Sequence, residues 1–406
     1  MSESQDLMVL KSDRYMKKLC GEISERCVGS KGNIKATGFF AEKLSSFGFD
    51  VEMPRFHCFD WHDHGANLKV NGQSFEVFTC PYSVGSELTG ELCTIASLEQ
   101  LKQVDGTGKI ALLKDEIARE QLMPKNFPFY NPQEHQEIIS LLESKGFNGI
   151  ISATGVNLEI AGGIYPFPLI EDGDFNLPAV YMKDVEGERL SAYDGQEVNM
   201  EVRAERIPSE GCNVVARKGD HKAPRLVFLA HLDCKQGTPG AIDNASGIVT
   251  LLLLGELLAD FKGPLQVEIT AINGEDYYSN PGEQLYLETI KDRFPEILLA
   301  INIDGVGYIN SKTAFSLYNL PPGLQETVKE VFSGFNGIIE GASWYQGDHS
   351  LFLQKQIPAL ALTSEQMEKI LKVAHTEADR PDLVDCSMLA EVAIALSKLV
   401  KALSNE

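Results

Sequence analysis

Residues 225–247 read RLVFLAHLDCKQGTPGAIDNASG, an apolar run followed by a histidine, two acidic residues and a series of small residues. The apolar run at 225–230 predicts a buried β-strand, because short continuous apolar segments are typical of strands covered on both faces. His231 and Asp233 follow the strand directly, and Asp243 comes next in a loop that contains Gly, Ala and Ser. Polar side chains beyond the carboxyl end of such a strand are typical of a functional site in an α/β fold.

Two later apolar segments end in the same way. The segment LQVEITAIN runs into Glu275 and Asp276, and the segment LLAINI runs into Asp304. The carboxyl ends of neighbouring parallel strands meet at one edge of a sheet. We therefore expect these acidic residues to lie near His231.

The alternation of strands and helices predicts the fold class and the domains. From about residue 205 onward, apolar strand segments alternate with helical segments, which predicts an α/β domain with helices on both faces of its sheet. The stretch 76–204 has strands and a helix of its own and predicts a smaller inserted α/β domain. A chain of 406 residues is too long for one ordinary core. We therefore expect a main domain of 1–75 and 205–406, with the insert at 76–204.

Charge and composition argue against several partners. The chain has 36 Lys and Arg against 58 Asp and Glu, a formal net charge of −22. This balance disfavours nucleic acid and an anionic membrane surface, because both attract basic residues. No apolar run reaches the ~18 residues of a membrane span, and the first residues do not resemble a signal peptide. The eight cysteines are scattered without a C-x-x-C pair, so we expect reduced thiols and a cytoplasmic location.

The polar residues at the strand ends, together with a histidine near the C-terminus, are side chains that bind zinc, cobalt or manganese. The five candidate metal ligands are His231, Asp243, Asp276, Asp304 and His375. They include no thiolate, which argues against a closed structural zinc site. Five ligands are too many for one tetrahedral metal with an open position, but they suit two divalent metals ~3.5–4 Å apart with a bridging carboxylate. Asp243 is the natural bridge because it lies in a loop.

The remaining acidic residues support the site or act in catalysis in this interpretation. His231 and Asp233 are two residues apart on an extended chain and point the same way. Asp233 can therefore accept the other ring N–H of His231 or support the site in another way. Glu275 and Asp276 are neighbours, so one should bind a metal while the other reaches the activated water as a general base.

Five motifs in this order closely resemble the co-catalytic zinc aminopeptidases of peptidase family M28, which include bacterial leucyl aminopeptidases and glutamate carboxypeptidase. The motifs are HLD…GAIDNASG (231–247), NGED (273–276), NIDGVG (302–307), GDHSLFLQKQIPAL (347–360) and HTEADRPDLVD (375–385). The resemblance covers about 205–406, and CVGSKGN at 27–33 is similar to the family's N-terminal segment. It implies a zinc-exopeptidase-like α/β fold, a twisted mixed sheet flanked by helices on both faces. Within the insert, FNLPAVYM at 175–182 resembles a protease-associated domain.

The resemblance also implies a role for each residue. Asp243 would bridge two metal ions, most simply zinc, with cobalt or manganese as alternatives, and Asp233 would support the site. Glu275 would be the general base. The implied metal pairs are His231 with Asp276, and Asp304 with His375. The acid at Asp304 would also hold the free amine of the substrate, so the chain would remove N-terminal residues from peptides as an aminopeptidase.

Some residues depart from the family pattern or have an open role. Residue 276 is Asp where relatives usually have Glu, and the shorter side chain must approach its metal more closely or bind it more weakly. His349 falls where relatives have a His or Tyr that hydrogen-bonds the oxyanion, so it is either an electrophilic catalyst or a structural neighbour. Tyr345 is a second candidate for that role or a wall of the pocket. His62 and His64 form an H-x-H pair in a polar segment, which is typical of solvated surface.

Two other functions are compatible with the motifs. Glutaminyl cyclases share the fold and nearly the same motifs but use one zinc ion for cyclisation, and the protease-associated insert favours a peptidase over them. A non-catalytic binding protein that has lost its metals is the second alternative. The presence of all five candidate ligands and Glu275 argues against it. The sequence also allows a homo-oligomer.

Overall fold

The computed structural model describes residues 3–23, 25–127 and 131–404, and the chain divides into two compact units. Unit 1 runs up to Cys58 and resumes at Glu210, and unit 2 is Phe59–Ser209. The insert therefore begins earlier than residue 76 and ends later than residue 204, which corrects both predicted boundaries. The reason is that β2 (Arg55–Val70) is one long strand, and unit 2 begins within it. It pairs with β9 (Glu197–Cys212) in the sheet of unit 2.

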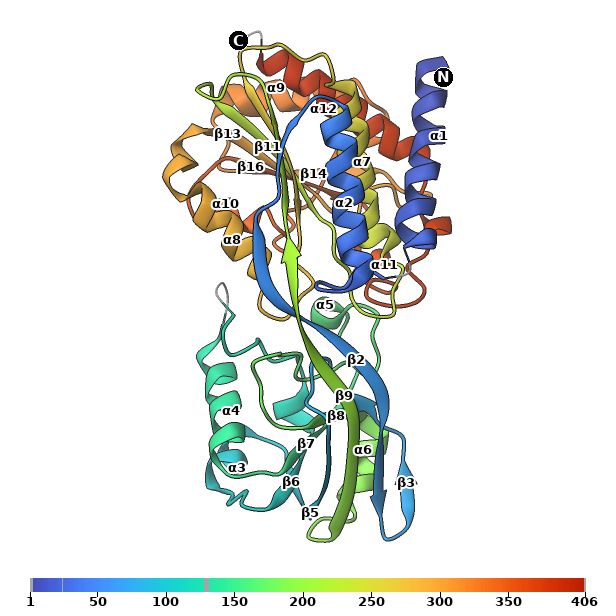
Figure 1. Cartoon of the computed structure of the whole chain (residues 1–406), viewed down its shortest axis with the longest axis vertical. Coiled ribbons are helices and arrows are strands. Elements are labelled where there is room, and N and C mark those ends of the chain that lie inside the picture. Colours follow the sequence, from blue (N-terminus) through green and yellow to red (C-terminus); the bar gives the residue numbers. More distant parts are fainter. Residues whose placement is uncertain (1–2, 24, 128–130, 405–406) are drawn as a thin grey trace. The chain divides into compact units, whose positions relative to one another are not determined.

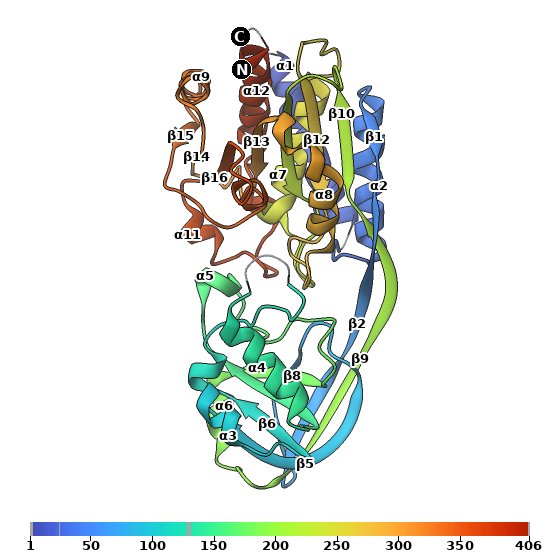
Figure 2. The same cartoon turned by 90° about the vertical axis from the view of Figure 1, so that its left-hand side faces the viewer.

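Unit 1 is built on an eight-stranded mixed sheet with the order β1–β10–β12–β11–β13–β16–β14–β15, and Figure 2 shows the strands in this order across the unit. The strands are β1 (Asp50–Glu52), β10 (Val214–Lys218), β11 (Arg225–His231), β12 (Gln266–Ile272), β13 (Ile297–Ile303), β14 (Thr313–Tyr318), β15 (Ile338–Glu340) and β16 (Ala359–Ser364). The four central strands run parallel, and β10, β14 and β1 add antiparallel pairs toward the edges. Every residue of β11 and β12 is buried, as the continuous apolar runs predict.

Helices flank this sheet on both sides. Figure 1 shows α1, α2 and α7 on one side and α8 and α10 on the other. The helices are α1 (Glu3–Lys17), α2 (Lys31–Ser46), α7 (Ser246–Leu257), α8 (Pro281–Ile290), α9 (Pro322–Ser333), α10 (Ser350–Leu353), α11 (Met367–Ile370) and α12 (Cys386–Leu403). Helix α7 is apolar on nearly all sides because it packs on β11 while α1, α2 and α12 contact its other faces. The predicted α/β class, a mixed sheet flanked by helices, is confirmed.

Unit 2 has its own eight-stranded mixed sheet, in the order β3–β2–β9–β5–β6–β7–β8–β4. Its further strands are β3 (Gln73–Phe75), β4 (Phe78–Thr79), β5 (Ser86–Ile95), β6 (Lys109–Leu113), β7 (Gly149–Thr154) and β8 (Ala179–Lys183). Strands β5 to β8 run parallel, and the helices of the unit are α3 (Leu98–Gln103), α4 (Gln133–Ser144), α5 (Leu158–Ala161) and α6 (Asp184–Ser191). Two apolar clusters form its core, so unit 2 has a core separate from that of unit 1.

All eight cysteines have free thiols. Within the described ranges, none of the helices combines the length and the apolarity that crossing a bilayer requires.

Candidate metal centre

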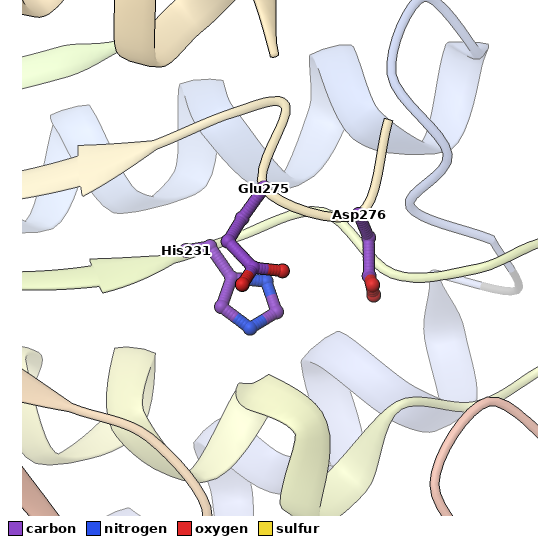
Figure 3. A group of neighbouring side chains, drawn as sticks. All are labelled: His231, Glu275 and Asp276. Atoms are coloured by element: carbon purple, nitrogen blue, oxygen red, sulfur yellow. The ribbon is translucent and has the colours of Figure 1, made fainter. Parts of the chain in front are cut away.

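The loops that follow three neighbouring parallel strands bring the predicted site residues together. Strand β11 lies between β12 and β13, so its last residue, His231, is flanked by the chain ends that carry the acidic residues. Glu275 and Asp276 follow β12 after a short turn, and Asp304 follows β13 directly. Figure 3 shows His231, Glu275 and Asp276 converging from two of these strand ends.

Asp243 lies between the two histidines. Its Oδ1 is 3.1 Å from Nε2 of His231, and its Oδ2 is 3.1 Å from Nε2 of His375. Each oxygen of one carboxylate therefore faces a different imidazole, which is the arrangement expected of a bridging ligand. His375 has a left-handed backbone with φ of 63°, a conformation that a non-glycine residue keeps only where its surroundings fix it.

The structure corrects the pairing of ligands that the resemblance implied. Nε2 of His231 lies 3.9 Å from Oδ1 of Asp304, whereas Nε2 of His375 lies 3.3 Å from Oδ1 of Asp276. Three groups of three candidate ligand atoms lie within 4.8 Å of one another; one joins His231 with Glu275 and Asp276, and the other two include Asp243. The two groups around Asp243 differ in their other members. One group has His231 and Asp304, and the other has His375 and Asp276. The reason is that the loop after β12 carries Asp276 past His231 toward the segment that holds His375.

The residues present fit two divalent cations. The donors are imidazole nitrogens and carboxylate oxygens without a thiolate, the set that suits catalytic zinc. Nε2 of His231 and Oδ2 of Asp276 are buried and make no hydrogen bond of regular geometry, although Nε2 of His231 lies 3.1 Å from Oδ1 of Asp243. Buried polar atoms without a well-formed hydrogen bond are costly, and a cation bound beside each of them would satisfy it.

The pKa shifts in the centre show an excess of negative charge. Burial alone would lower the pKa of His231. The nearby carboxylates of Glu275, Asp243 and Asp304 instead raise this pKa well above its ordinary value. Burial likewise disfavours the charged form of Asp243, yet its contacts with His231 and His375 hold the pKa of its carboxyl far below the usual range. Burial and nearby carboxylates together raise the pKa of Glu275 well above normal. Divalent cations would offset much of this negative charge.

Asp233 supports the loop that carries Glu275 and Asp276. Its Oδ1 accepts the backbone N–H of Gly274 at 2.8 Å, and its Oδ2 accepts that of Asp276 at 3.1 Å. Its carboxylate is 4.0 Å from Nδ1 of His231, and the same nitrogen lies 3.2 Å from the backbone carbonyl oxygen of Asp233. Of the two roles open from the sequence, the contacts favour support of the neighbouring loop.

His349 and Tyr345 lie on the loop that approaches Asp304. His349 is buried, its Nε2 lies 2.8 Å from the carbonyl oxygen of Trp344, and its ring centroid is 5.0 Å from that of Tyr318. Burial lowers the pKa of His349, so a neutral ring is favoured. Tyr345 is 76% exposed. These contacts give His349 a structural role, and its part in catalysis stays a prediction.

The H-x-H pair of the insert lies on β2, with its two rings 6.4 Å apart and both side chains exposed. It does not form one of the metal-ligand groups found among the described residues. Two residues that contact the loop carrying Asp243 were not predicted, although one of them, Asp379, lies within the motif at 375–385. Asp379 accepts the backbone N–H groups of Ile242 and Asp243, and Arg26 donates to the carbonyl groups of the same loop. A lone arginine near an N-terminal helix has no local pattern that reveals such a role.

Residues 213–400 match the model of peptidase family M28. This part of the chain is a peptidase family M28 domain. It contains Glu275 and all five candidate ligands. Among curated proteins, a leucine aminopeptidase 2 from Arthroderma otae is 23% identical to this chain over 360 residues, which cover 82% of this chain and 67% of that protein.

Several solved structures of other proteins share the fold of this chain. An aminopeptidase from Aneurinibacillus sp. strain AM-1 aligns with a TM-score of 0.75 and 20% identity over 97% of this chain and 93% of its own. BSAP, a zinc aminopeptidase from Bacillus subtilis, aligns with a TM-score of 0.74 and 18% identity over 96% and 95%. A glutaminyl cyclase from Porphyromonas gingivalis aligns with a TM-score of 0.53 and 12% identity over 97% of each chain. The fold is thus more similar to these aminopeptidases than to that cyclase.

Proposed function

We propose that this chain is a two-metal aminopeptidase that removes N-terminal residues from peptides with a free amino terminus. One observation carries the proposal: the two oxygens of Asp243 face two different histidines, and each histidine has a further carboxylate beside it. A site for a single metal ion would need only one of these histidines with its neighbouring carboxylates. The M28 domain and the likeness to zinc aminopeptidases support peptide hydrolysis as the reaction.

Zinc is the proposed cation, with cobalt and manganese as chemically similar alternatives. When bound, two such ions lower the pKa of water and polarise the carbonyl group that is attacked. The chain would hold one ion with His231 and Asp304 and the other with His375 and Asp276. Asp243 would contribute one oxygen to each.

Glu275 is the proposed general base. Its carboxylate lies within 4.8 Å of ligand atoms of His231 and Asp276, yet neither three-ligand group around Asp243 needs it. From this position its carboxylate can accept a proton from the attacking water. The protonated side chain then donates that proton to the leaving amine, which restores the starting state.

The charge of the centre favours substrates with a cationic end. Glu275 and Asp304 follow β12 and β13, the two strands that flank β11, and two divalent ions would offset the negative charge of the carboxylates around them only in part. A protonated terminal amine is attracted to carboxylates, whereas a blocked terminus lacks that charge. We therefore expect acetylated peptides to be poor substrates.

The test combines zinc analysis with hydrolysis of aminoacyl-nitroanilides before and after chelation. Wild type should bind two zinc ions per chain and lose activity with a chelator, and zinc should restore it. Glu275→Gln should keep its zinc and lose about 10²–10⁴-fold in kcat. Glu268→Gln is the matched control, because Glu268 is fully buried on β12 but hydrogen-bonds Arg217, Arg225 and Tyr286 away from the centre. Its kcat should stay close to wild type.

Four results would contradict the proposal. Hydrolysis that resists chelation, or full activity in Glu275→Gln, would refute the mechanism. Ammonia release from an N-terminal glutaminyl peptide without peptide cleavage would assign the chain to the cyclases. Zinc-loaded protein that is inert on all these substrates would indicate a binding protein.

We also propose that unit 2 is related to protease-associated domains. The support is the segment 175–182, which resembles such domains and runs into β8, the last strand of the parallel part of the sheet of unit 2.

A further inference from the structure

The loop between His231 and Asp243 must fix two ligands that share a metal. His231 is anchored in the central strand β11, but the chain then crosses a segment with Gly237, Pro239 and Gly240 before it reaches Asp243. Glycine and other small residues have little side chain with which to hold a loop in place. Contacts from other segments must therefore determine where Asp243 lies relative to His231.

Arg26 provides such contacts at both ends of the loop. It is 1% exposed, and its Nε donates to the carbonyl group of Leu232 at 2.9 Å. Its Nη1 donates to that of Pro239 at 2.8 Å, and its Nη2 to that of Gly240 at 2.7 Å. The guanidinium has donors in a rigid planar fork, so one side chain ties the start of the loop to its end. A further bond to the carbonyl group of Leu19, at 3.0 Å, ties the loop to the N-terminal segment.

The contact with Arg26 requires a residue without a side chain at position 240. The backbone of Gly240 is left-handed, with φ of 56°, and a Cβ atom at this position would lie 2.7 Å from Nη2 of Arg26. That distance is too short for a carbon next to a guanidinium nitrogen, so any side chain would displace the arginine. The glycine and the arginine therefore depend on each other.

Asp379 holds the other side of the same loop. It is completely buried, and its Oδ1 accepts the backbone N–H of Ile242 at 2.8 Å while its Oδ2 accepts that of Asp243 at 3.1 Å. Its backbone carbonyl also accepts the N–H of Ala241 at 3.3 Å. Asp379 is four residues after His375, so these bonds tie the loop of one metal ligand to the loop of another.

We propose that Arg26 and Asp379 are positioning residues that fix the bridging carboxylate of Asp243 between the two metals. Neither residue binds a metal or touches substrate; each acts through the backbone of residues 232–243. Because Asp243 is shared, loss of either residue should weaken both metal sites together. The inference rests on the two-metal function proposed above.

The test measures zinc affinity of the full-length chain by competition with a chromogenic chelator, with kcat as a second readout. Arg26→Ala and Asp379→Asn should each weaken both sites about 10–100-fold, the range for residues that orient metal ligands. Millimolar guanidinium should restore much of the zinc affinity of Arg26→Ala. Arg26→Lys should not restore it, because one ammonium group cannot reach both ends of the loop.

Arg225 provides the matched control. It is also fully buried in unit 1, but it pairs with Glu268 and Glu296 at the opposite end of β11. Arg225→Ala should lower stability to urea while leaving zinc affinity near wild type. Asp379→Asn keeps the shape of the side chain, so it tests the proposal even if Arg26→Ala does not fold.

Wild-type zinc affinity in both Arg26→Ala and Asp379→Asn would overturn this inference, and so would an equal loss of affinity in Arg225→Ala. These results would leave the two-metal aminopeptidase intact. A wild-type chain that binds two zinc ions but hydrolyses no peptide would refute the proposed function instead, while the zinc measurements would still decide the role of Arg26.

Discussion

The pairing of ligands in the metal centre can be tested with two double variants. In the structure, Asp276 shares a site with His375, and His231 belongs to the other site. Asp276→Ala/His375→Ala therefore damages one site, whereas His231→Ala/Asp276→Ala damages both. Zinc held by four protein ligands is bound by about 10–16 kcal/mol, or about 2.5–4 kcal/mol for each ligand. Loss of one ligand should weaken its site about 10²–10³-fold.

The assay is zinc content per chain after dialysis in a chelator buffer whose free zinc lies between the affinities of an intact and a damaged site. Wild type should retain two zinc ions, Asp276→Ala/His375→Ala one, and His231→Ala/Asp276→Ala none. Circular dichroism checks that each variant is folded. If His231→Ala/Asp276→Ala kept one zinc ion and the other variant kept none, the pairing read from the structure would be wrong.

Three further predictions follow from contacts around the centre. In Asp233→Asn, the side-chain amide can accept only one of the two N–H bonds that the carboxylate accepts. Zinc affinity, measured by competition with a chelator, should therefore fall about 10–100-fold. An unchanged zinc affinity would contradict the supporting role of Asp233. Gly247→Ala should cost about 1–3 kcal/mol in urea unfolding, because a Cβ there would lie 2.4 Å from the carbonyl oxygen of Ile303. Gly38→Ala is the control, because a Cβ atom at this position in helix α2 meets nothing within 4 Å. It should raise the free energy of unfolding by up to about 1 kcal/mol. Equal changes in the two glycine variants would refute the argument. Burial raises the pKa of the Cys234 thiol to about 12, so peptide mass spectrometry should find it alkylated at pH 8 only after denaturation, and rapid alkylation of the native chain would contradict this.

The residues of the centre could be predicted from the sequence because their side-chain types and their positions after apolar runs both indicate a site. His231, Glu275, Asp276 and Asp304 each follow an apolar run, and a buried strand in an α/β sheet leaves its polar residues at the carboxyl end. His375 has no such strand before it and was found through its motif. The structure brings these five residues together with Asp243.

The domain boundary was harder to predict for a physical reason. Strand β2 has a mixed pattern of exposed and buried residues along its length, because it is long and lies near the edge of its sheet. Such a strand gives a weak periodic signal. The start of the insert was therefore predicted too late in the chain.

The sequence by itself determined the α/β class, the strands that form the centre of the main sheet and the kinds of side chain at their ends. These features depend on local composition, since continuous apolar runs must be buried and their polar ends must face solvent or a ligand. Only the tertiary structure decided which ligands share a metal and what holds Asp243 in place. Both depend on residues far apart in the chain, such as Arg26 and Gly240 or Asp243 and Asp379. Their contacts follow from strand order and the direction of the loops, which no local pattern encodes.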